Sequence, residues 1–366
     1  MSEKLGLYIH IPFCKSKCAY CDFYSGKACE KDYDEYVMHL NDKIKYWSKK
    51  TDKALTSVYI GGGTPSVLGT DRLCGILDCV KSCFLINDNA EITVEINPES
   101  GKDLDFYKLR ESGVNRISVG MQSSDEKELK TLGRIHNTDD VKLTIGNAQS
   151  AGINNISLDL MLGIPYQTKE SLKRSIDYCS SLGVTHISSY ILKIEEGTPF
   201  YKNKSSIPFP DEDEQSELYL FAVEYMSSLG YEQYEISNFA KKGYESRHNT
   251  SYWTLDDYIG IGPSAHSFYK GKRFYYERDM QSFYQNITVD DGSGGDEEEF
   301  IMLSLRLKSG LGFEEYTKRF QKPVPDRIMR TADKYIKMDL MEFDDNRLFF
   351  TPKGFLVSNS IISELI

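Results

Sequence analysis

The sequence lacks an excess of basic residues. Its 44 Lys and Arg residues are outnumbered by 55 Asp and Glu residues, and the formal net charge is -11. Proteins that bind long RNA or DNA need a positively charged surface to neutralise the phosphates. We therefore expect no nucleic acid as the main partner, although a single arginine can still hold a small anionic ligand.

Long apolar runs are also missing. No stretch approaches the roughly 18 consecutive apolar residues of a membrane-spanning helix. The first residues, MSEKLGLYIH, lack the basic region and the apolar region of a secretory signal. We therefore expect a cytoplasmic protein, in which grouped cysteines indicate metal binding or catalysis more often than disulfide bonds.

The arrangement of apolar residues predicts an α/β fold. Helical patterns separate most of the β-rich runs in the first two thirds of the chain, which lie at 5–11, 57–63, 91–97, 116–121, 155–161 and 186–192. Strand–helix units in series predict a parallel sheet, either open or curved into a partial barrel. The functional side chains of such sheets lie at the carboxyl ends of the strands.

Composition divides the chain into four segments. Residues 1–200 form the predicted core, and residues 201–289 extend it and contain the sequence HNTSYW. The acidic, glycine-rich segment 290–299 is predicted as a flexible linker. Residues 300–366 are predicted as a small, mostly helical C-terminal domain, which resembles a winged helix because three helical patterns precede a hairpin.

Three cysteines lie within eight positions, directly after the first predicted strand. Cys14, Cys18 and Cys21 have the spacing C-x3-C-x2-C, which can hold three irons of a [4Fe-4S] cluster. Structural zinc stays an alternative, although zinc sites usually have four ligands in two separated C-x2-C pairs. Candidates for a fourth zinc ligand lie outside this loop and are His10, Cys29 and His39.

The motif GGGTP at the end of the second predicted strand gives the cysteine loop a context. Together the two motifs resemble the radical S-adenosylmethionine (SAM) superfamily, whose fold is a partial (β/α)6 barrel. In that family SAM chelates the cluster iron that no cysteine binds. The resemblance implies both cofactors and an electron donor such as flavodoxin or ferredoxin. GGGTP is not a phosphate loop, because no Gly-Lys-Ser/Thr follows it.

Further motifs narrow this resemblance. YIHIPFC, VEINPE, SVGMQS, LGRIHN and DLMLGIPYQT follow one another along residues 8–168. The series is similar to the coproporphyrinogen dehydrogenase branch of the superfamily, which includes haem chaperones of the HemW type. By this resemblance the residues that bind SAM are Tyr8, Tyr20, Gly62, Gly63, Thr64, Glu95, Gln122, Arg134 and Asp159.

Two features favour the haem chaperones over the dehydrogenase. The first is the motif H-N-x-x-Y-W, in which an exposed His248 flanked by aromatic residues is a candidate ligand for haem iron. The alternative is a structural role, with His248 capping a loop and Trp253 in the core. The second is Phe23, which stands where the dehydrogenase has another cysteine.

These observations predict a radical-SAM protein that binds haem as cargo and passes it to an acceptor protein. The first alternative is an enzyme like oxygen-independent coproporphyrinogen III oxidase, acting on a porphyrin or another small substrate. The second is a structural protein organised by zinc. The sequence leaves open whether SAM is cleaved, whether the acceptor is membrane-bound and whether the protein forms a homodimer.

Overall fold

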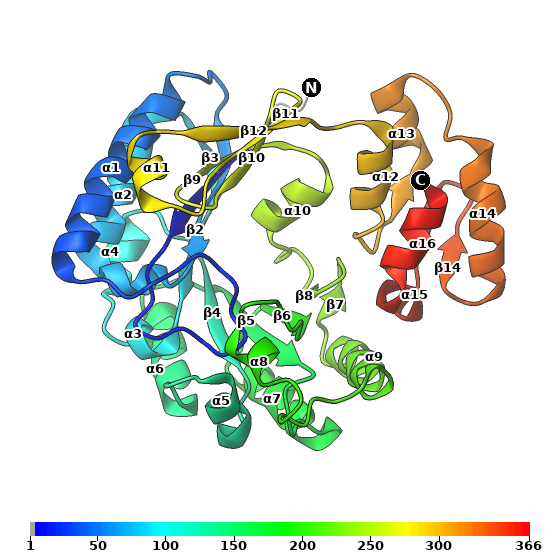
Figure 1. Ribbon diagram of the computed structural model, residues 1–366, viewed down its shortest axis with the longest axis horizontal. Helices are drawn as coiled ribbons and strands as arrows, with labels where there is room; N and C mark the ends of the chain where they lie inside the picture. The colour runs from blue at the N-terminus through cyan, green and yellow to red at the C-terminus, as the bar shows by residue number, and fades with distance from the viewer. Residues whose placement is uncertain (1–3) are drawn as a thin grey trace.

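The centre of the protein is one large, curved sheet. The computed structural model describes residues 4–366. The sheet contains twelve strands in the order β12-β11-β10-β9-β1-β2-β3-β4-β5-β6-β8-β7 (Figure 1). Strands β1 to β6 run parallel in sequence order, which confirms the predicted partial barrel. These strands are β1 (Leu5–Ile11), β2 (Leu55–Gly62), β3 (Ile86–Ile96), β4 (Arg116–Gln122), β5 (Asn155–Leu162) and β6 (His186–Ile191).

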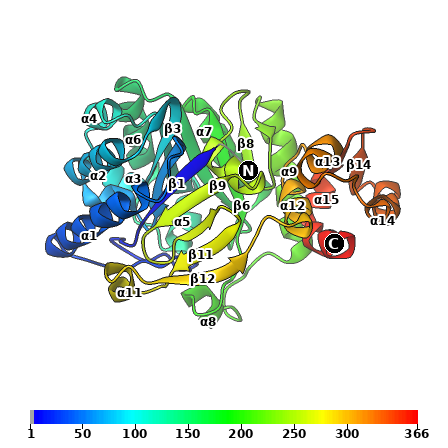
Figure 2. The same cartoon turned by 90° about the horizontal axis from the view of Figure 1, so that it is seen from above.

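Helices cover the outer face of the parallel strands, as Figure 2 shows from above. The longer helices bury an apolar stripe, for example Tyr33, Tyr36, Leu40 and Ile44 on α1. The helices of this region are α1 (Glu30–Ser48), the 3-10 helix η1 (Pro65–Leu68), α2 (Thr70–Cys83), α3 (Pro98–Gly101), α4 (Phe106–Glu111), α5 (Glu126–Leu132), α6 (Thr138–Ser150), α7 (Lys169–Ser181), α8 (Pro199–Lys202) and α9 (Glu212–Ser228).

Alternation along the parallel strands gives the sheet one apolar and one polar face. In β4 the residues Ile117, Val119 and Met121 belong to the apolar core under the helices. The alternate residues of the strand, including Arg116 and Ser118, point to the opposite face because side chains alternate along a strand. The concave side of the barrel is therefore lined by polar side chains.

The segment after α9 extends both edges of the sheet and closes the space between them. β8 pairs antiparallel with β6, and β9 pairs parallel with β1. Helix α10 connects these two edges and lies across the open side of the barrel (Figure 1). The elements are β7 (Glu232–Gln233), β8 (Asn238–Ala240), α10 (Arg247–Trp253), β9 (Asp257–Ile261), β10 (His266–Tyr269), β11 (Lys272–Tyr276), α11 (Met280–Tyr284) and β12 (Thr288–Ser293).

The prediction of a flexible linker at 290–299 was wrong. The first part of this segment belongs to β12, which pairs antiparallel with β11. The last part begins helix α12 (Glu297–Ser304), in which the Glu299 backbone N–H is capped by the Asp296 side chain. Acidic residues favour a helix N-terminus, because they accept its free N–H groups and face its positive dipole end. The acidic run is thus a helix start.

The C-terminal domain combines helices with a small antiparallel sheet, as predicted. Its three strands have the order β13-β15-β14. Two backbone hydrogen bonds join it to the barrel: Ile236 donates to Arg306 at 3.0 Å, and Lys308 donates to Tyr234 at 2.9 Å. Its remaining elements are β13 (Leu311–Gly312), α13 (Phe313–Phe320), α14 (Asp326–Lys337), β14 (Met341–Phe343), β15 (Arg347–Phe350), α15 (Pro352–Leu356) and α16 (Ser358–Leu365).

Among the helices of residues 4–366, none combines the length and the apolar composition that crossing a bilayer needs.

Candidate functional site

A cavity of about 490 Å³ lies inside the curve of the sheet, at the carboxyl ends of the parallel strands. The structure brings most of the predicted site residues to its wall. They are Cys14, Cys18, Tyr20, Cys21, Gly62, Gly63, Thr64, Glu95, Gln122, Arg134 and Asp159. Tyr8 and His248 instead line a neighbouring cavity of about 460 Å³.

The cysteine loop is held at both ends by backbone hydrogen bonds. Cys14 donates to Gly26 at 2.9 Å, which closes the loop on itself. Ala19 donates to Leu132 at 3.1 Å and accepts from Phe200 at 3.0 Å. The loop is thereby fixed between the end of α5 and the start of α8, with its cysteines toward the cavity.

The three loop cysteines are free thiols and half-buried. Thr64 donates a hydrogen bond to the Cys14 sulfur at 3.3 Å. Burial raises the pKa of Cys21, and the other two thiols add to this effect. A bound cation would reverse it by stabilising the thiolate. Three thiols facing one cavity fit the three-cysteine ligand set of a [4Fe-4S] cluster.

The candidate zinc ligands do not join these cysteines. His10 donates from Nε2 to the Tyr24 carbonyl at 2.9 Å, so its Nδ1 accepts from the Tyr8 hydroxyl at 2.9 Å. The His39 ring stacks on Tyr284 at 4.1 Å. Within residues 4–366, no three His, Cys, Asp or Glu side chains converge into a closed metal site.

The glycines of GGGTP allow β2 to end against the cysteine loop. Gly62 has a φ of +108°, and a Cβ there would lie 2.3 Å from Nδ1 of His10. A Cβ on Gly63 would lie 2.7 Å from the Phe13 carbonyl oxygen. Side chains at these two positions would push the motif away from the loop that carries the cysteines.

Two half-buried carboxyl groups line the cavity. Glu95 accepts from the Tyr59 hydroxyl at 2.7 Å and from the Gly62 backbone N–H at 3.0 Å. Burial raises the pKa of Glu95 to about 7, although both hydrogen bonds oppose this shift. Asp159 accepts from the Ser118 hydroxyl at 3.0 Å, and burial raises its pKa as well.

Gln122 and Arg134 complete the polar wall. Gln122 has a φ of 70°, a left-handed conformation that non-glycine residues seldom adopt and that often marks a functional position. Arg134 donates from Nη2 to the Tyr20 hydroxyl at 2.8 Å, while its buried Nε has no partner within the described residues. Such an unpartnered donor is costly unless a ligand or water accepts from it.

Sequence reasoning missed several residues of the wall, above all Arg116. This side chain is only 1% exposed and lines the same cavity. The alternation in RISVGMQ was the signal that could have found it, since Arg116 lies an even number of residues before Gln122 and therefore shares its face. The other missed residues include Tyr59, Ser118, Ser188, Tyr190 and Asn249.

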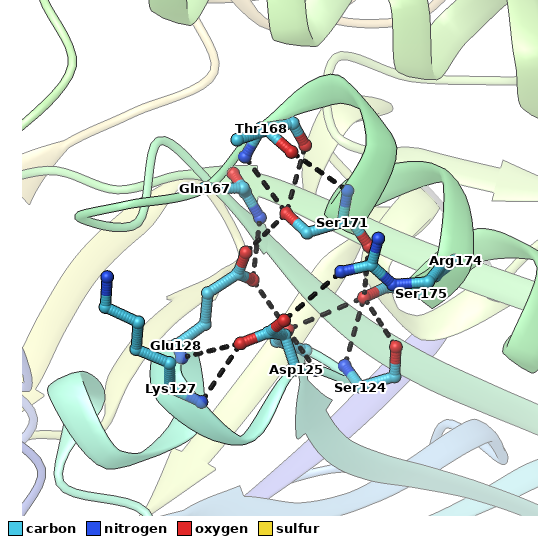
Figure 3. Close-up of polar contacts among 10 residues, drawn as sticks. Ser124, Asp125, Lys127, Glu128, Gln167, Thr168, Ser171, Arg174 and Ser175 are labelled. Atoms are coloured by element: carbon cyan, nitrogen blue, oxygen red, sulfur yellow. Dashed lines mark hydrogen bonds and ion pairs between the residues drawn. The ribbon is translucent and has the colours of Figure 1, made fainter.

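A buried polar cluster joins α5, whose end contacts the cysteine loop, to α7, and Figure 3 shows its polar contacts. At its centre Glu128 is 1% exposed and accepts from Ser123 at 2.6 Å and Ser171 at 2.5 Å. Burial raises the pKa of Glu128, and the serine hydroxyls counteract the shift. The cluster joins α5 to α7, and α5 ends at Leu132, which accepts from the loop residue Ala19.

The prediction of an exposed His248 was wrong. The side chain is 1% exposed, its Nδ1 lies 2.8 Å from the Ser57 hydroxyl, and its Nε2 lies 2.7 Å from the Tyr252 hydroxyl. Burial lowers the pKa of His248 to about 3. The reason is that α10 folds into the open side of the barrel, where it is capped by Glu91, which accepts from the His248 backbone N–H at 3.0 Å.

Comparisons with known proteins agree with these features. Residues 8–179 match the Radical SAM superfamily, and residues 297–357 match the HemN C-terminal domain. The chain is 32% identical over 372 residues to "Heme chaperone HemW" of Bacillus subtilis, with 98% of each chain covered. It is 30% identical over 379 residues to the HemW of Mycobacterium tuberculosis H37Rv, covering 100% of this chain and 95% of that one.

The chain belongs to the HemW family. This membership confirms the resemblance inferred from the motif series. Among solved structures, the chain is similar to coproporphyrinogen III oxidase (HemN) of Escherichia coli, a radical SAM enzyme, with a TM-score of 0.84 and 19% identity. That likeness covers 99% of this chain and 89% of the other, and it shows a shared fold. For this HemW-family chain the comparisons thus show the family and the fold.

Proposed function

We propose that the protein is a haem chaperone that uses a [4Fe-4S] cluster and SAM. The observation that carries the proposal is the full-length similarity to HemW proteins, in a chain whose three free thiols face one polar cavity. When bound, the cluster and SAM supply one-electron chemistry. We propose Cys14, Cys18 and Cys21 as the cluster ligands.

The cavity wall supplies what SAM binding requires. Glu95, Gln122 and Asp159 offer hydrogen-bonding groups for the ribose and the amino group, and Arg134 offers an N–H fork for a carboxylate. Tyr20 holds Arg134 through a hydrogen bond at 2.8 Å. Gly62, Gly63 and Thr64 line the same cavity, where Gly62 donates to Glu95 and Thr64 donates to Cys14. We propose that these residues orient SAM and keep it beside the cluster.

We propose the second cavity as the place of the haem ring. Aromatic side chains from several elements line it, namely Tyr8, Tyr59, Tyr190, Tyr252 and Trp253. Such side chains favour a flat, apolar ligand. Iron ligation by His248 would require this side chain to leave Ser57 and Tyr252, and hence a movement of α10. Partners in this proposal are a haem-acceptor protein and a small electron-transfer protein, in the cytoplasm.

The experiment is a haem titration of anaerobically purified protein, followed by the Soret band. We expect saturable binding and iron and sulfide contents near four per chain, as for one [4Fe-4S] cluster. A variant with Cys14, Cys18 and Cys21 changed to alanine should lose iron and sulfide. The matched control is Cys29→Ala, because Cys29 is an exposed cysteine that follows the loop in the sequence but lies outside it. Absence of saturable haem binding by the wild type would refute the function.

A further inference from the structure

Arg116 is a buried cation that the proposed function does not yet use. It is the first residue of β4, and its neighbours in register are Thr93 on β3 and Asn155 on β5. It lines the cavity that contains the cysteine loop, and it is 1% exposed. A guanidinium keeps its charge at every physiological pH. Arg116 therefore places a permanent positive charge on the floor of the barrel.

Two of the three guanidinium nitrogens of Arg116 have no hydrogen-bond partner among residues 4–366. Nε and Nη1 of Arg116 are buried and make no hydrogen bond. The neighbouring Thr93 hydroxyl and Asn155 side-chain oxygen are also buried without partners. A buried charge that is neither paired nor hydrogen-bonded is strongly destabilising. Of these three side chains only Arg116 lines the cavity, so its unpartnered donors are the ones that a ligand or an ordered water in the cavity can reach.

The nearby carboxylates are engaged elsewhere. Glu91 accepts from the backbone N–H groups of Arg247 at 3.1 Å and His248 at 3.0 Å. Asp159 accepts from Ser118 at 3.0 Å. Both carboxylates attract Arg116 at longer range, but neither lies within ion-pair distance. The fork of Arg116 is therefore available to an acceptor that enters from the cavity.

Arg116 lies away from the end of the cavity that carries the cysteine loop, although its charge still acts on Glu95 and Asp159. Arg134 lies beside Tyr20 of the cysteine loop, at the upper end. Arg116 begins the strand that ends at Gln122, and strands rise about 3.3 Å per residue, so the two ends are about 20 Å apart. A carboxylate bound close to the cluster belongs with Arg134. A carboxylate at Arg116 belongs to a ligand that reaches the start of β4.

We propose that Arg116 binds a carboxylate of the tetrapyrrole cargo. This inference rests on the proposed function. The two cavities share Tyr59, Glu95, Tyr190 and Asn249 on their walls, so a ring in the second cavity can send an acidic side chain toward Arg116. A guanidinium fork matches a carboxylate better than it matches any neutral group. Arg116 thereby selects cargo that carries free carboxylates.

The test compares haem with haem dimethyl ester, which has the same ring and no carboxylates. The wild type should bind haem at least about tenfold more tightly than the ester, as expected for one charged hydrogen-bonded pair. Arg116→Gln should weaken haem binding to the level of the ester and leave the affinity for the ester unchanged. Arg116→Lys should keep part of the preference. Arg110→Gln, at an exposed position of α4, is the matched control.

A second arm identifies the source of the carboxylate. SAM and decarboxylated SAM are titrated into the wild type and Arg116→Gln. The proposal requires the variant to change the two affinities equally. Selective weakening of SAM would assign Arg116 to the cofactor and overturn the proposal. Equal haem-to-ester ratios in wild type and variant would overturn it too, and would assign the site to water while leaving haem binding itself intact.

Folding is checked in the same samples. Urea unfolding of Arg116→Gln should give a midpoint no lower than that of the wild type, because the variant removes an uncompensated buried charge. If Arg116→Gln does not fold, Arg116→Lys decides, since it must then bind haem more weakly than the wild type while binding the ester equally. Failure of the wild type to bind haem at all would refute the proposed function, and this extension with it.

Discussion

Among the residues that line the cavity, Glu95 has a carboxyl group whose pKa is strongly raised by burial. Its carboxyl group lies between Tyr59 and Gly62, and burial raises its pKa from 4.5 to about 7. The folded protein therefore holds this proton more tightly than the unfolded chain does. Between pH 4.5 and pH 7, Glu95 ionises in the unfolded chain but stays largely protonated in the folded protein. The free energy of unfolding therefore falls as the pH rises through this range.

Glu95→Gln should remove this pH dependence. From pH 5 to pH 8 the free energy of unfolding of the wild type should fall relative to that of the variant by up to about 3 kcal/mol. The fall in the free energy of unfolding is smaller than this upper value to the extent that solvent in the cavity reaches Glu95. His10 and His248 act in the opposite direction, since burial lowers the pKa of both, but they are present in both proteins and cancel. Urea unfolding at the two pH values measures the difference. A constant difference would contradict the raised pKa.

Residue types and strand ends could be predicted from the sequence, but burial could not. Glu95 and Asp159 were predicted from the family resemblance, and both lie within predicted β-rich runs near the carboxyl ends of parallel strands, which meet at one edge of the sheet. Arg116 was missed because it begins its strand, where the rule expects no functional group. His248 was predicted as exposed because its burial depends on α10 entering the barrel, a contact between distant parts of the chain.

At the scale of elements, α5 connects the buried polar cluster around Glu128 to the cysteine loop. The cluster fixes the start of α5 against α7 (Figure 3), and the end of α5 accepts the Ala19 backbone N–H. Neither α5 nor α7 contains a proposed ligand of the [4Fe-4S] cluster. The sequence predicted the helical pattern of α7 but gave no sign of this polar contact, because hydrogen bonds between helices depend on their packing.

Glu128→Ala should destabilise the protein and loosen the loop. Two buried serine hydroxyls would lose their acceptor, which costs about 2 kcal/mol. Iron content after anaerobic purification should fall together with the unfolding midpoint. Glu126→Ala is the matched control, because Glu126 lies on the exposed face of the same helix. Full iron content with a lowered midpoint would show that α5 does not position the loop.

At the scale of the whole molecule, the C-terminal domain supports the wall of the second cavity. Residues 234–238 line that cavity in part, and the backbone around Arg306 pairs with the same segment. Arg306 also donates to Ser358 at 3.0 Å and Asn359 at 2.6 Å, both at the start of α16. The predicted linker would have left this domain free, whereas β12 and α12 connect it to the barrel with only three residues between them.

Arg306→Ala should therefore loosen the cavity wall from a distance. The substitution removes two hydrogen bonds that tie α16 to the end of α12, with an expected loss of about 1–2 kcal/mol. Hydrogen exchange should accelerate at the Ile236 and Lys308 amides, which form the backbone bonds between the domains, while the amides of β1 to β5 stay protected. Arg330→Ala, on the exposed side of α14, is the control.

Haem affinity should fall in Arg306→Ala and not in the control, because the ring site shares its wall with residues 235–238. Accelerated exchange without a change in haem affinity would place the cargo elsewhere than in the second cavity.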